Sequence, residues 1–494
     1  MKIRFVLLLT STWLLGACAV IPADRGSAQS IELLRSRSGV AASVKLDAMH
    51  ASEADSLKDM LTQPLDADAA VRVALVSSPR LQALYAQLGL AQADVYDASR
   101  LSNPSLGFMR LTGDGGTRTT WTLTQGFMEL LFIHYRSALS HSASLQAKQR
   151  LAQSVLNLEA EVRTAYYRYV AASLVAQLHE QAQLATQVSA DYAQSLFDAG
   201  NISELQLSRE RAAGSEARVA LHVSQSDRLQ RRGELLTMMG VSASTSGIAF
   251  VERLDIPVAQ SLDLPGLQQW AEQQRVDLLL TREQLSMYDR ARTHARRWFW
   301  LDGAEVQAER ERETDGARLN GIGGSVGLPL FNQGGGARLR AQAQWEAAQA
   351  ELTALRLSIG NELAVQVESL QRARAAVNEY RETLMPLRER IVELSQQQQN
   401  FMLIGTFELL SAKHELLQAY QDYLNATGEY WIRHVELART VGGRLPDAAG
   451  DASYGISVGV DALPAAAAES ARATGAVDEH AGHSHADMNS EETP

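Results

Sequence analysis

The feature that most constrains this chain is a pair of long segments with almost no helix breaker. Residues 127–199 contain neither Gly nor Pro, and residues 337–404 contain only Gly360 and Pro386. Apolar residues of the first segment alternate steps of four and three, the spacing of a coiled-coil seam, at Leu151, Val155, Leu158, Val162, Ala165 and Tyr169. About sixty helical residues extend on the order of 90 Å, so each rod must pack on other rods.

Each long segment ends at a turn from which the chain returns along another helix. The stretch FDAGNISELQL begins at Phe197, and MLIGTFELLSA begins at Met402. Aligning Gly200 with Gly405 gives an offset of 205 residues, and we therefore predict two halves of similar plan. Both glycines are predicted to adopt positive φ at the turn. A pair of coiled-coil hairpins that serves as a structural spacer fits these segments equally well.

The N-terminus is typical of a bacterial secreted lipoprotein. Lys2 and Arg4 precede an apolar run that ends in LGAC, residues 15–18, and this run is too short to span a membrane permanently. LGAC resembles a lipobox, so we predict a signal peptide over 1–17 and a lipidated Cys18. In the alternative interpretation, Ala17-Cys18-Ala19 belongs to an ordinary cleavage site and Cys18 is removed with the signal.

Composition argues against several classes of function. Cys18 is the only cysteine, so stability must come from packing and association rather than from disulfides. The formal net charge is −11, and it becomes −13 without Lys2 and Arg4, which disfavours nucleic-acid binding. No later stretch approaches roughly 18 consecutive apolar residues, so any further insertion into a membrane would use strands.

The chain between the N-terminus and the first rod alternates between helical and extended patterns. Residues 18–63 are polar and predict an extended arm. A helix is predicted to begin near Asp66, with Asp66 or Asp68 as its cap, and Pro79 fits the first position of a second helix.

Two stretches break from helical spacing and alternate with period two, as hairpins do. They cover residues 103–125 in the first half and 298–331 in the second. In the second stretch Val306 and Ala308 alternate with Glu305 and Glu309, the pattern of a membrane strand with one wet side. A soluble β-ribbon is the alternative, although two strands alone are marginally stable.

In this order the features resemble the TolC family of outer-membrane efflux proteins over about residues 66–446. The resemblance rests on the lipobox, on the duplicated plan and on five stretches, SPRLQA (78–83), VDLLL (276–280), LPLFNQGGGARLRAQ (328–342), LLTMMG (235–240) and LARTVGG (437–443). The first half departs from the second at ELLFIHY, residues 129–135, where the second has PLFNQGG. This departure leaves the end of the first hairpin undefined.

The resemblance implies a mainly α fold with a membrane β-barrel. Long antiparallel helices of a homotrimer would form a periplasmic tube, and each chain would give four strands to one shared barrel among outer-membrane lipids. The chain would then comprise a first repeat over 64–245, a second repeat over 246–446 and a flexible tail over 447–494. A lipid-anchored protein of the bacterial outer membrane is implied, with two partners: a periplasmic adaptor (membrane fusion protein) and an inner-membrane pump of the RND type.

The resemblance also assigns roles to the two turns. The adaptor would contact Gly200, Asn201, Ile202, Gly405, Thr406 and Phe407. The charges nearest the pore entrance would be Asp198, Glu204 and Glu408. Symmetry would repeat each carboxylate three times, and such rings attract cations and repel anions. Ordinary solvated turn charges are an equally good interpretation of these residues.

The tail ends in DEHAGHSHADMNSEETP, which is rich in metal-binding side chains. His480, His483, His485 and Met488 could bind Cu, Zn or Ni ions weakly, and no other cofactor is expected. An inert acidic tail is the alternative. The His residues favour heavy-metal cations as the transported substrate.

We predict that the chain is not an enzyme. GISVG, residues 455–459, matches the G-x-S-x-G pattern, but this chemistry requires a strand–turn–helix within a parallel sheet. A passive exit duct for heavy-metal efflux is the preferred interpretation. A multidrug or secretion duct of the same fold and a non-channel periplasmic metal-binding lipoprotein are the alternatives.

Overall fold

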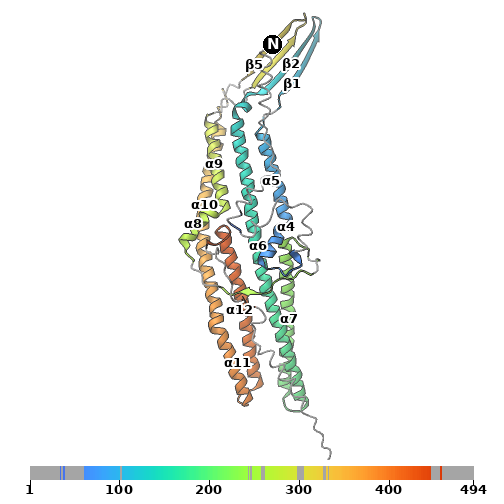
Figure 1. Ribbon diagram of the computed structural model, residues 1–494, viewed down its shortest axis with the longest axis vertical. Coiled ribbons are helices and arrows are strands. Elements are labelled where there is room, and N and C mark those ends of the chain that lie inside the picture. Colours follow the sequence, from blue (N-terminus) through green and yellow to red (C-terminus); the bar gives the residue numbers. More distant parts are fainter. Residues whose placement is uncertain are drawn as a thin grey trace, which may run out of the picture.

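The protein is an elongated bundle of helices with a four-stranded sheet at one end (Figure 1). The computed structural model describes residues 34, 37–38, 60–100, 103–242, 244, 247–257, 262–297, 305–325, 330–331, 333–446 and 457–458. Within these residues, no helix is both long and apolar enough to cross a membrane.

The same order of elements occurs in both halves, with two short helices, a hairpin, a long rod and a returning helix. The first half contains α4 Ala67–Ser77, α5 Pro79–Ala98, β1 Ser105–Gly113, β2 Gly116–Gly126, α6 Phe127–Asp198 and α7 Glu204–Met239. The second half contains β3 Leu254–Asp255, α8 Leu264–Gln274, α9 Val276–Arg297, β4 Glu305–Arg312, β5 Arg318–Ser325, α10 Gly335–Glu379, η4 Tyr380–Leu384, α11 Met385–Asn400 and α12 Thr406–Thr440.

Helix α6 runs from the sheet to the opposite end of the molecule (Figure 1). Its 72 residues correspond to a length of about 110 Å. All six seam residues predicted from the sequence are buried, and they belong to the core that α6 shares with α4, α5 and α12. The periodicity therefore identified the face on which the neighbouring helices pack.

Local signals set the ends of several helices. The Asp66 carboxylate caps α4 by accepting a hydrogen bond from the Ala69 N–H at 2.7 Å, and Pro79 stands in the first turn of α5. In the second rod, a five-residue π turn, Tyr380–Leu384, directly precedes the turn that contains Pro386. Since proline lacks an N–H and crowds the preceding turn, a locally widened helix accommodates it without ending the rod.

Each returning helix ends against the turn between the two short helices of its own half. Gly240, after α7, has φ 72° and lies so close to the turn after α4 that an added Cβ would be 2.8 Å from the Ser77 carbonyl oxygen. Gly442, after α12, has φ 99°, and a Cβ added there would be 3.0 Å from the backbone of Gln274 and Arg275. Helices α7 and α5 therefore meet end to end beside α6, and α12 and α9 do so beside α10.

A connecting segment joins the halves at mid-height. Its residue Phe250 forms a parallel bridge with Leu65, and the Tyr166 hydroxyl donates to the Val251 carbonyl at 2.7 Å. The Trp431 indole N–H donates to the Asp255 carbonyl at 2.7 Å, so both α6 and α12 bind this segment.

The structure differs from the sequence expectation at one place in the tail. Residues beyond 446 were expected to form a flexible extension, but Ser457–Val458 forms strand β6, which pairs antiparallel with β3. A strand of two residues is held by its main chain, and main-chain pairing with a distant segment leaves no periodic signal in the sequence.

Candidate functional site

The first tip, residues 199–203, joins α6 to α7 at the end of the molecule opposite the sheet. Gly200 has φ 75°, and its N–H donates to the Phe197 carbonyl at 2.8 Å. The Asn201 N–H donates to the Leu196 carbonyl at 2.8 Å, which completes a Schellman ending. Ser203 and Gln206 then form a capping box that begins α7.

The second tip, residues 401–405, has the same backbone geometry as the first tip. Its residues align with those of the first tip differently from the prediction. Gly405 has φ −78° and stands at the N-cap of α12, so its predicted positive φ is wrong. Met402 adopts the left-handed conformation instead, with φ 59°. The structural equivalents are Gly200 with Met402 and Ser203 with Gly405, and the offset is 202 rather than 205. Glycine is acceptable both at an N-cap and after a C-cap, so its presence alone did not identify the position.

The second tip is the more apolar of the two. Phe401, Met402 and Leu403 are exposed, and Met402 is exposed to 92%. Phe407 is exposed to 57%, and the Arg209 guanidinium of α7 lies 5.2 Å from its ring centre. This contact joins the two tips within one chain.

The predicted tip residues lie at this end of the molecule as a group. Gly200, Asn201, Gly405 and Thr406 are exposed, whereas Ile202 is partly buried. Asp198, Glu204 and Glu408 are all exposed. The Asp198 carboxylate accepts a hydrogen bond from the Gln194 side chain at 2.8 Å, and no contact among the described residues joins the three carboxylates to one another.

At the other end, the hairpins of the two halves form one antiparallel sheet in the order β1-β2-β4-β5. Residues directly opposite each other on paired strands point to the same face. One row therefore joins Leu106, Leu123, Ala308 and Ile322, and the next joins Phe108, Trp121, Arg310 and Asn320. The Phe108 and Trp121 rings are 4.6 Å apart. We call this the apolar face.

The opposite face of the sheet carries polar and acidic side chains on its two central strands and also Met109, Leu111 and Leu319 on its two outer strands, and we call it the acidic face. Its members on the two central strands are Thr120, Thr122, Thr124, Glu305, Gln307, Glu309 and Glu311. Arg118 forms an ion pair with Glu311 on this face. The alternation of Val306 and Ala308 with Glu305 and Glu309 thus separates the two faces. The same alternation places Arg310 and Arg312 on the apolar face, toward the hairpin turns.

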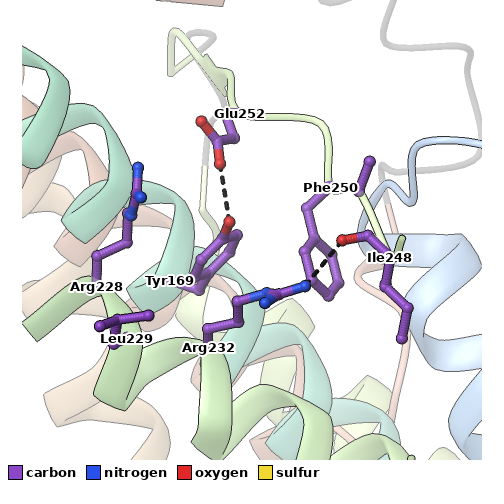
Figure 2. Close-up of a pocket in the computed structure, with 8 residues that line it drawn as sticks. Tyr169, Arg228, Leu229, Arg232, Ile248, Phe250 and Glu252 are labelled. Atoms are coloured by element: carbon purple, nitrogen blue, oxygen red, sulfur yellow. Dashed lines mark hydrogen bonds between the residues drawn. The ribbon is translucent and has the colours of Figure 1, made fainter. Parts of the chain in front are cut away.

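A pocket of about 270 Å³ lies at mid-height between α6, α7 and the connecting segment (Figure 2). The Tyr169 hydroxyl donates to Glu252 at 2.8 Å, and Arg232 donates to the Ile248 carbonyl at 3.0 Å. Burial and this bond to Glu252 raise the pKa of Tyr169 to about 12. These hydrogen bonds hold the connecting segment on the helices.

Several predicted site residues lie outside the described residues. They are Cys18 at the predicted lipidation site and the tail ligands His480, His483, His485 and Met488. Within the described part of the chain, no group of three or more His, Cys, Asp or Glu side chains is placed to hold a metal ion.

Comparison with known proteins identifies the fold. No family model matches the sequence, and no curated protein matches it either. Among solved structures, the chain is similar to CusC, described as forming a transmembrane channel, with TM-score 0.65, 14% identity and coverage of 78% of this chain and 94% of CusC. It is similar to a membrane protein from Pseudomonas aeruginosa, with TM-score 0.66, 16% identity and coverage of 78% and 95%.

The outer membrane protein VceC from Vibrio cholerae gives TM-score 0.62 and 17% identity, with coverage of 76% of this chain and 96% of VceC. The matched structures are thus covered over nearly their whole length. The mainly helical fold predicted from the sequence is confirmed, and the chain has the TolC-like fold of these membrane proteins.

Proposed function

We propose that this chain is the outer-membrane channel of a tripartite efflux system. The observation that carries the proposal is the four-stranded sheet. Near the helices its central strands carry apolar residues on one face and acidic residues on the other, and its outer edges, at β1 and β5, pair with no other strand among the described residues. An open sheet with exposed edges is unstable in lipid, and closure with further copies satisfies its backbone groups. Three copies would form a barrel with the acidic faces lining a wet lumen.

The helices support association of several copies. Leu184, Val188 and Tyr192 form an exposed stripe on α6, and Leu387, Ile391 and Leu394 form another on α11. Steps of three and four residues place each set on one side of its helix. Large exposed apolar stripes mark surfaces that another chain covers. A homotrimer with a helical tube accounts for both stripes.

The tips support a partner at the end away from the membrane. The exposed Phe401, Met402, Leu403 and Phe407 would contact a periplasmic adaptor, together with the turn residues assigned from the sequence. The adaptor would connect the duct to an inner-membrane pump, and we propose one of the RND type. Cys18 would carry the lipid anchor. The chain itself would be a passive conduit rather than an enzyme.

We further propose heavy-metal cations as the substrate, on the strength of His480, His483, His485 and Met488 in the tail. A multidrug duct is the competing function. Growth of a deletion strain, with and without the restored chain, should be measured across copper, silver, zinc, cobalt, cadmium, dyes and antibiotics. Sensitivity to one or two metals supports the metal duct, whereas sensitivity confined to dyes and antibiotics contradicts it.

Barrel closure has a direct test. Cysteines placed on β1 and β5, at Gly107 with Leu319, Gly321 or Gly323 in turn, should give disulfide-linked trimers in membranes. A Cys at Gly107 paired with one at Ser224, which lies on α7 far from the sheet, is the control. Absence of cross-linked trimers from every β1–β5 pair would overturn the shared barrel, whatever the substrate.

A further inference from the structure

Arginine side chains form a row across the apolar face of the sheet, near the hairpin turns. The strand register places Arg110 of β1 opposite Thr119 of β2, Thr119 opposite Arg312 of β4, and Arg312 opposite Arg318 of β5. Arg310 lies on the same face, one row nearer the helices. The hairpins thus bring together four exposed arginines from both halves of the chain.

None of these four arginines forms an ion pair among the described residues. Arg118, on the acidic face of the same sheet, does pair with Glu311. The hairpin turns carry the carboxylates of Asp114, Glu313 and Asp315, and Asp315 accepts a hydrogen bond from the Ala317 N–H at 2.8 Å. Like charges placed directly opposite each other, such as Arg312 and Arg318, destabilise a sheet unless an anion lies between them. Within the described residues, therefore, no carboxylate pairs with these arginines, and an anion from outside the protein would balance their charge.

The neighbouring rows indicate where that anion comes from. The row nearer the helices contains Arg310 together with the Phe108–Trp121 pair, and the row after it contains Leu106, Leu123 and Ile322. Successive rows on one face are about 7 Å apart along a strand. Aromatic residues favour the boundary between hydrocarbon and water, and arginines just beyond it meet headgroups.

We propose that Arg110, Arg310, Arg312 and Arg318 form a binding site for the phosphate groups of membrane lipids. The planar guanidinium binds phosphate through two parallel hydrogen bonds, and the rows below would contact the acyl chains of the same lipid. This inference rests on the proposed function, because only a sheet in a membrane presents its apolar face to lipid. The site lies at the end of the sheet farthest from the helices (Figure 1).

Binding can be measured with the full-length protein in detergent, using fluorescent bis-phosphorylated lipid A as the probe. The double variant Arg312→Gln/Arg318→Gln should bind this lipid at least about tenfold more weakly, because it loses two charge-assisted contacts to phosphate. Arg118→Gln, on the opposite face, is the matched control and should bind as the wild type does. If the double variant fails to assemble, Arg312→Lys/Arg318→Lys keeps the charge and should show a smaller loss.

Three outcomes would overturn the site. They are unchanged affinity in the arginine variants, equal binding of lipid A from which both phosphates have been removed, and equal competition by inorganic phosphate, which would indicate a soluble anion. Conductance of the same preparations in planar bilayers separates this inference from the proposed function. A conducting protein whose variants bind lipid normally overturns the lipid site alone, whereas a chain that forms no trimer and no pore overturns the function.

Discussion

Gly200 and Gly240 share a left-handed backbone but have different surroundings. Their φ angles are 75° and 72°, yet an added Cβ meets no atom within 4 Å at Gly200 and lies 2.8 Å from the Ser77 oxygen at Gly240. Gly200→Ala should cost about 1 kcal/mol, the cost of the dihedral alone. Gly240→Ala should cost about 3 kcal/mol, because the backbone must also shift. Urea denaturation of the two variants measures the difference, and equal losses would contradict a steric role for Gly240.

His434 should make stability depend on pH. Its ring lies 5.3 Å from Trp431 and 6.3 Å from Tyr430, and burial followed by repulsion from Arg163 lowers its pKa from 6.5 to about 4. Because the folded pKa lies below the unfolded value, protonation favours unfolding. The neutral ring's contribution to the free energy of unfolding is complete above pH 6.5 and is lost as the pH falls toward 4. Each pH unit in this window should cost up to about 1.4 kcal/mol.

The measurement is the urea midpoint of wild type, His434→Gln and His222→Gln at several pH values across this window. His222 is exposed on α7 and serves as the control. The wild type and the control should lose stability in parallel, and His434→Gln should lose less. A His434→Gln profile as steep as that of the wild type would assign the pH dependence to other groups.

Helices α6 and α12 lie close together where Gly428 faces Ala171. A Cβ on Gly428 would lie 2.9 Å from the Ala171 Cβ, which no packed interface tolerates. Gly428→Ala should therefore destabilise the protein by about 1–3 kcal/mol despite the better helix propensity of alanine. Ala171→Gly alone should cost about 1 kcal/mol. The double variant should be at least about 1 kcal/mol more stable than the sum of the two single losses in unfolding free energy predicts, and a double-mutant cycle measures this difference. Simple additivity would show that the helices separate freely.

The elements that the sequence predicted well are those whose signals are local. The seam of α6 is a periodicity within one helix, and Asp66 and Pro79 mark helix starts through bonds only a few residues away. The second tip was aligned incorrectly because Gly405 was taken as the equivalent of Gly200, whereas Met402 has the strained conformation. The cost of placing a methionine there, about 1–2 kcal/mol, is small enough for an exposed turn to tolerate.

At the scale of the whole molecule, the pairing between segments distant in the sequence could not be predicted from local patterns. Each hairpin could be predicted from alternation, but β2 pairs with β4 across nearly 190 residues, and this pairing alone places Arg110 in line with Arg312. The pairing of β3 with β6 was missed for the same reason. The tip carboxylates Asp198, Glu204 and Glu408 are exposed, and their predicted place at a pore entrance stays a prediction because it depends on neighbouring copies of the chain.

The acidic face leads to a prediction about the assembled channel. Glu305 and Glu309 form no ion pair among the described residues, whereas Glu311 is neutralised by Arg118. If three copies close the barrel, the unpaired carboxylates repeat around the lumen, and rings of this kind favour cations. Glu305→Gln/Glu309→Gln should lower the cation-to-anion permeability ratio by about two- to fivefold, because the ring then loses most of its negative charge.

The reversal potential in a KCl gradient across a planar bilayer measures this ratio. Arg310→Gln changes a charge on the same strand but on the apolar face, so it should leave the reversal potential unchanged. If the glutamate variant loses cation selectivity while Arg310→Gln keeps the wild-type reversal potential, the acidic face lines the lumen. The reverse result would mean that the sheet closes with its apolar face inward, which would overturn the lipid site while leaving a conducting duct.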